Sequence, residues 1–128
     1  MNFLLDTHTL IWFFGSDERL SPKAKQFIEN PSYKKYFSVA SIWEMGIKHS
    51  IGKLQLGMPL SEIVQHVQDN GIELINITEE HALRVGNLPL HHRDPFDRMI
   101  IAQCLCLDFG IIGKDKAFDL YLPLERIW

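Results

Sequence analysis

Cysteine is scarce in this sequence of 128 residues, which has only Cys104 and Cys106. These two residues are two positions apart in a stretch with helical character, where their side chains point apart and cannot form a disulfide. The fold therefore does not depend on disulfides, and we expect two buried thiols in a reducing compartment, the cytoplasm.

Long apolar runs are also missing. The runs at 10–14 and 99–102 fall far short of the ~20 residues that a membrane-spanning helix needs. The first six residues contain an acid at Asp6 and no basic segment, so we expect neither a secretory signal nor a membrane partner. The sequence has 46% hydrophobic residues, enough for one core, and its length predicts a single domain over 1–128.

A strong charge of either sign is absent as well. The chain has 13 lysines and arginines against 16 aspartates and glutamates, a net charge of −3 at pH 7. This total gives no electrostatic argument for a nucleic-acid partner. The net charge does not exclude a nucleic-acid partner either. If four acids belong to a metal site, the remaining 13 basic and 12 acidic residues have a net charge of +1.

Short apolar segments alternate with helical patterns along the whole chain. We expect strands at 3–5, 36–39, 72–75 and 109–112, with a last short apolar segment at 126–128. We expect helices at 7–15, 22–30, 40–49, 60–69, 79–85 and 95–107. Ser21-Pro22 and Asp94-Pro95 are typical helix starts, and the helix at 40–49 is apolar on most faces and should be largely buried. This order predicts an α/β fold, a parallel sheet with helices on both faces.

Four acids occupy positions where such a fold exposes its ligand site. Asp6 directly follows the first predicted strand, and Asp115 follows the strand that ends near Gly113. Glu44 lies about one turn into the helix after the second strand, and Asp97 lies in the first turn of its helix. Because ligands of open α/β sheets bind outside the carboxyl ends of the strands, we expect these carboxylates to meet at one edge.

Each acid also fits a structural role. Asp6 could be the N-cap of the next helix, Asp97 could complement a helix dipole, and Asp115 could be a turn residue. Glu44 is the hardest to explain in this way, because a charge buried among apolar residues without a partner costs several kcal/mol. Lys48, four residues further on, is its only local partner.

A cluster of carboxylates has a predictable chemistry. Two carboxylates ~4 Å apart repel by about 4 kcal/mol at an effective dielectric near 20, so a cluster takes up protons or binds a cation. Oxygen ligands favour Mg²⁺ or Mn²⁺ over zinc, and such an ion activates water for attack on a phosphodiester. We therefore expect metal-dependent phosphodiester hydrolysis. The pair His91 and His92 beside Asp94 is a weaker indication of zinc, because adjacent histidines rarely face one ion and no third soft ligand lies nearby.

Four segments of the sequence resemble the PIN-domain ribonucleases, and more narrowly the VapC toxins of bacterial and archaeal toxin–antitoxin pairs. They are LLDTH at 4–8, SIWEM at 41–45, HHRDPFDRMIIAQ at 91–103 and KDKAF at 114–118. The match follows chain order over nearly the whole sequence, and the block at 94–103 is its most specific part. The resemblance implies a three-layer α/β/α sandwich around a parallel sheet of four or five strands. It also implies a Mg²⁺- or Mn²⁺-dependent endoribonuclease that forms a homodimer and is neutralised by a small antitoxin.

The resemblance assigns the catalytic and metal-binding roles to the same four acids, Asp6, Glu44, Asp97 and Asp115. It also implies that Thr7 orients Asp6 through its hydroxyl. One position departs from the family: members usually carry threonine or serine two residues before the last aspartate, where this chain has Gly113. Asp115 would then bind the metal weakly or through water, and Asp119 could share its role.

Basic residues near the acids are candidates for contacts with the RNA backbone. Arg98, next to Asp97, has the best claim, followed by Lys48, Lys114 and Arg93, although any one of them is more often a solvated surface charge. Two alternatives stay open. A receiver-like phosphoryl-accepting domain would use Asp6 for Mg²⁺ and Lys114 for phosphate, but it leaves Glu44 and Asp97 without a role. A catalytically degenerate PIN-like module would only bind a partner.

Overall fold

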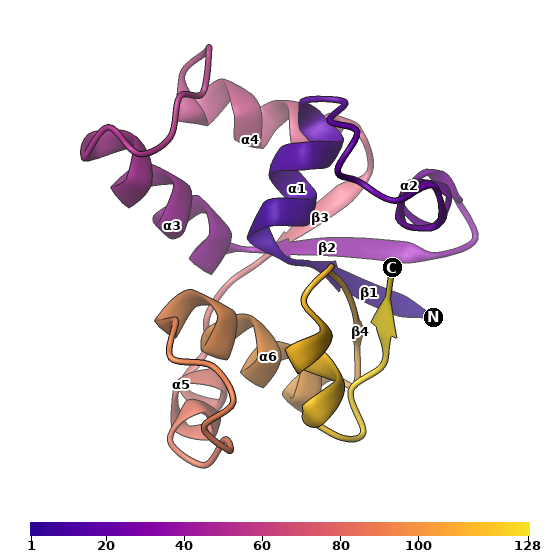
Figure 1. Ribbon diagram of the computed structural model, residues 1–128, viewed down its shortest axis with the longest axis vertical. Coiled ribbons are helices and arrows are strands. Elements are labelled where there is room, and N and C mark those ends of the chain that lie inside the picture. Colours follow the sequence, from indigo (N-terminus) through magenta and orange to yellow (C-terminus); the bar gives the residue numbers. More distant parts are fainter.

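A parallel sheet of five strands forms the centre of the molecule in the computed structural model, which describes residues 1–128 (Figure 1). The strands are β1 (Asn2–Leu5), β2 (Lys34–Ser38), β3 (Ile72–Ile75), β4 (Gly110–Ile112) and β5 (Arg126–Ile127). They lie in the order β3-β2-β1-β4-β5, and every neighbouring pair is parallel. The predicted α/β fold with a parallel sheet is confirmed.

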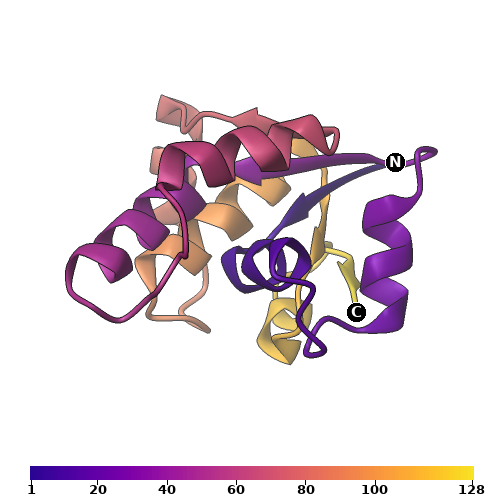
Figure 2. The ribbon, with the colours of Figure 1, turned by 90° about the horizontal axis from the view of Figure 1, so that it is seen from above.

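Helices cover both faces of this sheet and complete a three-layer sandwich (Figures 1 and 2). They are α1 (Thr7–Phe14), α2 (Pro22–Glu29), α3 (Val39–Ser50), α4 (Leu60–Asp69), α5 (Glu79–Val85), α6 (Pro95–Leu107) and the 3₁₀ helix η1 (Lys116–Leu120). Helices α1, α2 and α4 lie on one face, and α5, α6 and η1 lie on the other. No helix combines the length and the apolar character that crossing a membrane requires.

The alternation of side chains along β1 divides the core in two. Phe3 and Leu5 point to one face, where they pack against residues of α1, α2 and α4. Leu4 points to the other face, where it packs against α6 and η1. Because all three side chains are fully buried, β1 is fixed at the centre of the sheet and so is the direction in which it delivers Asp6.

Helix starts follow the capping signals of the sequence. The side chain of Asp94 accepts hydrogen bonds from the backbone N–H of Phe96 (2.8 Å) and of Asp97 (3.0 Å), with Pro95 in the first turn. Ser21 caps α2 and Thr78 caps α5 in the same way. The predicted limits of the helices at 60–69, 79–85 and 95–107 are confirmed to the residue.

Two features differ from the sequence expectation. Helix α3 is not largely buried, because Trp43 is 59% and Ile47 39% exposed, as is 59% of Ile51, the residue that follows the helix. The C-terminal half of α3 extends beyond the sheet, so the outer side chains of this half have no layer to pack against (Figure 1). Trp43, in the first half, packs edge-to-face against the ring of Phe96 and is otherwise open to solvent. The 3₁₀ helix η1 is not among the predicted helices, because Asp115 capping the N–H of Ala117 (2.9 Å) is its only local signal.

Candidate metal and active site

The sheet order brings the four predicted acids to one edge. The chain leaves β1 toward β2 on one side and later returns to β4 on the other, so the switch point of the sheet lies between β1 and β4. Asp6 follows β1 and Asp115 follows β4, one on each side of this point. Helices α3 and α6, which carry Glu44 and Asp97, pack against each other at the same edge.

Asp6 is almost completely buried and has a structural role as well as a place in the site. Its Oδ1 accepts a hydrogen bond from the N–H of Thr9 at 2.8 Å. Asp6 is therefore the N-cap of α1, which is the structural role that its position in the sequence allows. Burial raises the pKa of Asp6, and the negative charge of Glu44 raises it further, while the hydrogen bond from Thr9 acts in the opposite direction. The charge of Glu44, on α3, therefore lies close enough to Asp6 to disfavour the ionised form of Asp6.

Glu44 has one satisfied oxygen and one that is not. Its side chain is only 3% exposed, and Oε2 accepts a hydrogen bond from Nζ of Lys48 at 2.6 Å. Oε1 is buried and has no hydrogen-bond partner. Lys48 is thus the local partner that the helical spacing suggested, but it leaves a buried carboxylate oxygen free, which is costly unless a cation or a donor meets it.

Asp97 lies within the electric field of the other acids. Burial and, to a smaller extent, the nearby negative charges together raise its pKa to about 7. Those charges belong to Asp94, Asp6, Glu44 and Asp115, in decreasing order of effect. The three other predicted site acids therefore all lie close enough to Asp97 to disfavour its ionised form.

Asp115 is held at both of its carboxylate oxygens. Oδ1 accepts from the N–H of Ala117 at 2.9 Å, and Oδ2 lies 2.7 Å from Nε2 of His92. Burial alone would raise the pKa of Asp115, but these two hydrogen bonds, together with the electrostatic attraction of His92 and Arg126, outweigh it and hold the pKa below its ordinary value. Sequence reasoning misses the contact with His92, because the two residues are 23 positions apart and no local pattern joins them.

Two residues around the acids have structural partners of their own. The hydroxyl of Thr7 lies 2.8 Å from that of Ser41, so it ties the start of α1 to α3 rather than contacting Asp6. Asp119 forms a two-point ion pair with Arg126, at 2.9 and 3.0 Å. The carboxylate of Asp119 is therefore paired with Arg126, whereas the sequence suggests that it could share the metal-binding role of Asp115.

The donor set suits a hard divalent cation. It consists of carboxylate oxygens alone, which favour Mg²⁺ or Mn²⁺, and it includes the unpartnered Oε1 of Glu44. The side chains as they stand do not form a ready-made coordination cluster, because no three acidic, histidine or cysteine groups are close enough to hold one ion together. The site thus has the ligand chemistry and the repulsion that a cation would relieve, without preassembled geometry.

Comparison with known proteins identifies the family of the chain. The family model of the PIN domain matches residues 3–121. The chain belongs to the PIN domain family. The receiver-like alternative is therefore set aside.

Individual relatives of this PIN domain extend the comparison. It is 28% identical over 116 residues to Ribonuclease VapC22 of Mycobacterium tuberculosis, covering 88% of this chain and 86% of that protein. Its fold is similar to a chain of VapBC2 from Rickettsia felis bound to a promoter DNA fragment, with a TM-score of 0.71 and 11% identity over 98% of this chain and 97% of that one. It is also similar to a chain of VapBC-1 from nontypeable Haemophilus influenzae, with a TM-score of 0.70 and 18% identity over 98% and 96% of the two chains.

The basic residues predicted to contact RNA differ in whether their side chains already have partners within this PIN domain. The guanidinium of Arg98 donates to four backbone carbonyls at 3.0–3.4 Å: that of Val85 at the end of α5, and those of Leu88, Pro89 and His92 in the segment between α5 and α6. Lys48 is bound to Glu44. Lys114 and Arg93 are exposed, and Nζ of Lys114 lies 6.0 Å from the ring centre of Trp12.

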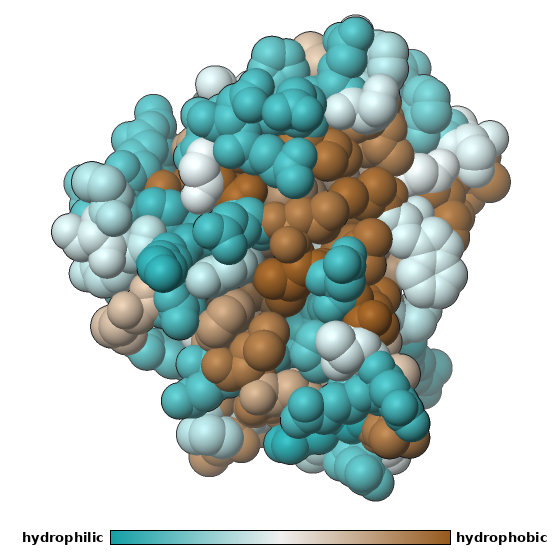
Figure 3. Space-filling model, turned by 180° about the vertical axis from the view of Figure 1, so that it is seen from behind, coloured by the Kyte–Doolittle hydropathy of each residue, from teal (hydrophilic) through white to brown (hydrophobic).

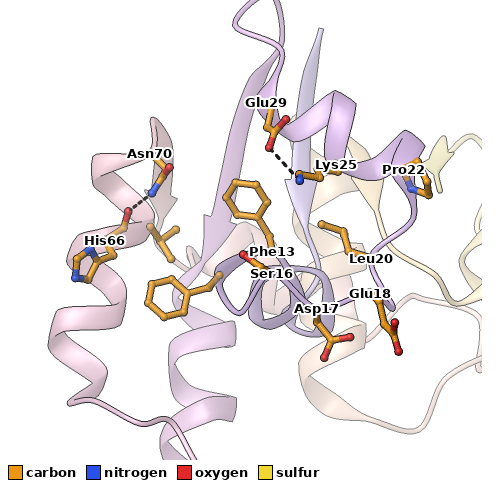
Figure 4. Close-up of a pocket in the computed structure, with 12 residues that line it drawn as sticks. Phe13, Ser16, Asp17, Glu18, Leu20, Pro22, Lys25, Glu29, His66 and Asn70 are labelled. Atoms are coloured by element: carbon orange, nitrogen blue, oxygen red, sulfur yellow. Dashed lines mark hydrogen bonds and ion pairs between the residues drawn. The ribbon is translucent and has the colours of Figure 1, made fainter.

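A hollow of about 560 Å³ lies elsewhere on the PIN domain, between the end of α1, α2 and α4 (Figure 4). Phe13 and His66 line it, together with the exposed ion pair of Lys25 and Glu29. None of the four site acids borders it. The acidic edge of the sheet is therefore a separate feature, recognised by its charge and burial rather than by its depth.

Proposed function

We propose that this PIN domain is a Mg²⁺- or Mn²⁺-dependent endoribonuclease that acts as the toxin of a toxin–antitoxin pair. One observation carries the proposal: Oε1 of Glu44 is buried without a partner at the carboxyl edge of the sheet, where the charges of Asp6, Glu44 and Asp115 add to burial in raising the pKa of Asp97. The relative Ribonuclease VapC22 and the fold shared with VapBC proteins support the same assignment.

Asp6, Glu44 and Asp97 would hold the ion, and Asp115 would complete the set. When bound, the ion supplies a lowered pKa for water and neutralises charge at the phosphodiester under attack. The residues themselves bind and orient: Lys48 fixes one oxygen of Glu44 and leaves the other for the ion. Asp97 binds in its ionised form, which the ion favours by offsetting the surrounding negative charges.

Two exposed cations are the best-placed contacts for the RNA backbone. Lys114 precedes Asp115, and Arg93 lies in the segment that leads into α6, so each is next to an acid-bearing turn. Neither forms an ion pair within the chain, so both are free to meet phosphate groups. Arg98, whose donors are occupied by backbone carbonyls, would act by holding the segment before α6 in place.

The partners of this proposal are an antitoxin protein and a second copy of the chain. Both of the similar structures contain VapBC proteins, which favours a small protein partner. Trp43 and Ile47 are exposed four residues apart on α3, and Ile51, which follows the helix, is exposed as well. A broad hydrophobic band also crosses the face turned away in Figure 1, as Figure 3 shows. Exposed apolar surface of this kind favours a homodimer.

The substitution Ile47→Glu tests the homodimer. We expect this variant to be a monomer when its mass is measured by size-exclusion chromatography with light scattering.

Cleavage of a labelled single-stranded RNA by the purified chain tests the proposal. We expect cleavage in Mn²⁺ that stops with EDTA and falls by roughly 100-fold or more in Asp6→Asn, because a ligand of the ion is lost. Asp69→Asn is the matched control, since Asp69 lies exposed at the end of α4 and should cleave like the wild type. Cleavage that persists in Asp6→Asn or in EDTA would contradict the proposal. A folded protein that binds no Mn²⁺ would favour the degenerate binding module instead.

A further inference from the structure

His92 lies buried between two parts of the proposed site. It belongs to the segment that leads into α6, and its Nε2 lies 2.7 Å from Oδ2 of Asp115 in the turn after β4. Its Nδ1 lies 2.9 Å from the hydroxyl of Tyr121. The imidazole stacks on the ring of Phe118 at 5.0 Å and 23° and on that of Tyr121 at 5.4 Å and 29°. Both nitrogens are therefore engaged, and two aromatic rings pack against the imidazole.

The chemistry of these contacts fixes the direction of each hydrogen bond. An ionised aspartate only accepts, so Nε2–H of His92 donates to Asp115. In the neutral imidazole Nδ1 then accepts, and the hydroxyl of Tyr121 donates to it. With the N–H of Ala117 on Oδ1, each oxygen of Asp115 has one donor and keeps a further lone pair for other ligands.

Asp115 needs such support more than the other acids of the site. Its side chain is 49% exposed, so packing alone does not fix its rotamer. Gly113, two residues earlier, has no side chain that could orient it. We propose that His92 is a positioning residue, which holds the carboxylate of Asp115 in place for the divalent ion from a distant segment of the chain. This inference rests on the metal-dependent function proposed above.

The same contact joins the two loops that carry acids. His92 is two residues before Asp94. The side chain of Asp94 caps α6 and accepts a hydrogen bond from the N–H of Asp97. The hydrogen bond to Asp115 thus fixes the turn after β4 relative to the start of α6. Partners that hydrogen-bond to metal ligands typically contribute 10–100-fold to metal affinity or activity, which gives the size of the effect expected here.

Two polar substitutions of equal chemistry separate the hydrogen bond from the packing. The amide nitrogen of His92→Gln reaches the place of Nε2 and can donate to Asp115, whereas that of His92→Asn corresponds to Nδ1 and cannot reach it. We expect Mn²⁺ affinity, measured by calorimetry, to fall by roughly 10–100-fold in His92→Asn and to stay near the wild-type value in His92→Gln. Equal affinity in all three proteins, or equal loss in both variants, would overturn the inference.

A double-mutant cycle shows whether His92 acts through Asp115. In the Asp115→Ala background, His92→Asn should cause no further loss of Mn²⁺ affinity, and additive losses would contradict the positioning role. Imidazole ¹⁵N shifts give a test that needs no metal: His92 should show the Nε2–H tautomer in the wild type and lose this preference in Asp115→Ala. A wild-type protein that binds no Mn²⁺ but shows this tautomer would refute the proposed function and not the hydrogen bond. Wild-type binding without any effect of His92→Asn would refute only the inference.

Discussion

The carboxylate of Asp6 fills the space beside the backbone of Gly113: a Cβ atom at residue 113 would lie 2.9 Å from Oδ2 of Asp6 and 2.8 Å from Cε2 of Phe118. Real Cβ atoms do not approach other heavy atoms this closely, so glycine is required for the observed position of Asp6. The family resemblance leads us to expect a hydroxyl side chain at residue 113. In this chain Gly113 contributes to the site in another way, by leaving space for the carboxylate of Asp6.

Gly113→Ala should therefore displace Asp6 and weaken the site. We expect a loss of about 1–3 kcal/mol in the free energy of unfolding, the usual cost of overpacking, together with weaker Mn²⁺ binding. Gly46→Ala is the control, because a Cβ there would meet Leu60 at an ordinary 3.6 Å. In the middle of α3 it should instead stabilise the protein by about 0.5–1 kcal/mol. Equal effects of the two substitutions in urea unfolding would contradict this explanation.

Lys48→Met should destabilise the metal-free protein, because it leaves the buried carboxylate of Glu44 without its 2.6 Å partner. We expect a loss of about 1–3 kcal/mol and a larger thermal stabilisation by Mn²⁺ than in the wild type, since the ion would replace the missing positive charge. Lys25→Met breaks another pair with a spacing of four residues, but that pair is exposed and 3.9 Å long. Its loss should cost less than about 0.5 kcal/mol, and a similar cost for both would count against a buried Glu44 charge.

The stability of the metal-free protein should fall as the pH rises from about 4 to 7. Asp97 has a pKa of about 7 in the folded chain against an ordinary 3.8, so across this window the folded state keeps a proton that the unfolded state releases. We expect a loss of roughly 2–4 kcal/mol across the window and a plateau above it. Asp17, whose pKa is lowered to about 2, acts in the opposite direction but below this window. Urea unfolding in EDTA at pH 5 and 8 should show a lower free energy of unfolding at pH 8 for the wild type, and a clearly smaller difference for Asp97→Asn. The same pH dependence in both proteins would refute the assignment of this effect to Asp97.

Arg98 and Lys114 should respond differently to substitution. Arg98→Ala removes donors from four backbone carbonyls, so it should lower the melting temperature and leave the salt dependence of RNA binding unchanged. Lys114→Ala removes an exposed charge, so it should keep the melting temperature and reduce the slope of log affinity against log salt by about one unit. A reduced slope in Arg98→Ala would instead place its guanidinium on RNA.

Much of the fold is accessible from the sequence because its signals are local. Asp94-Pro95 defines the start of α6, Thr78 defines that of α5, and the short apolar run of β1 indicates a buried strand. The edge at which the acids gather also follows from local signals, since parallel strands end on the same side. The exposure of Trp43 does not follow from them, because it depends on which residues of other segments, such as Phe96, pack against it.

The finer details of the site depend on contacts between distant residues. The sequence suggests only a zinc-ligand role for His92, and the contact that it makes with Asp115 joins segments that no periodicity relates. Arg98 is adjacent to Asp97 in sequence, which favours a role in RNA binding, but its helical position turns it toward the carbonyls of the preceding segment. In the sequence Gly113 indicates a missing hydroxyl, and only the three-dimensional arrangement shows that Asp6 occupies this space.

Asp6, Glu44 and Asp97 should share a divalent cation, and both the proposed function and the positioning role of His92 depend on this. An anomalous difference map from a crystal of this chain soaked in Mn²⁺ tests it most directly. We expect a peak at the carboxyl edge of the sheet, bounded by these three carboxylates and within about 2.0–2.3 Å of Oε1 of Glu44. A map in which Mn²⁺ binds elsewhere, or in which Glu44 stays paired with Lys48 alone, would contradict it.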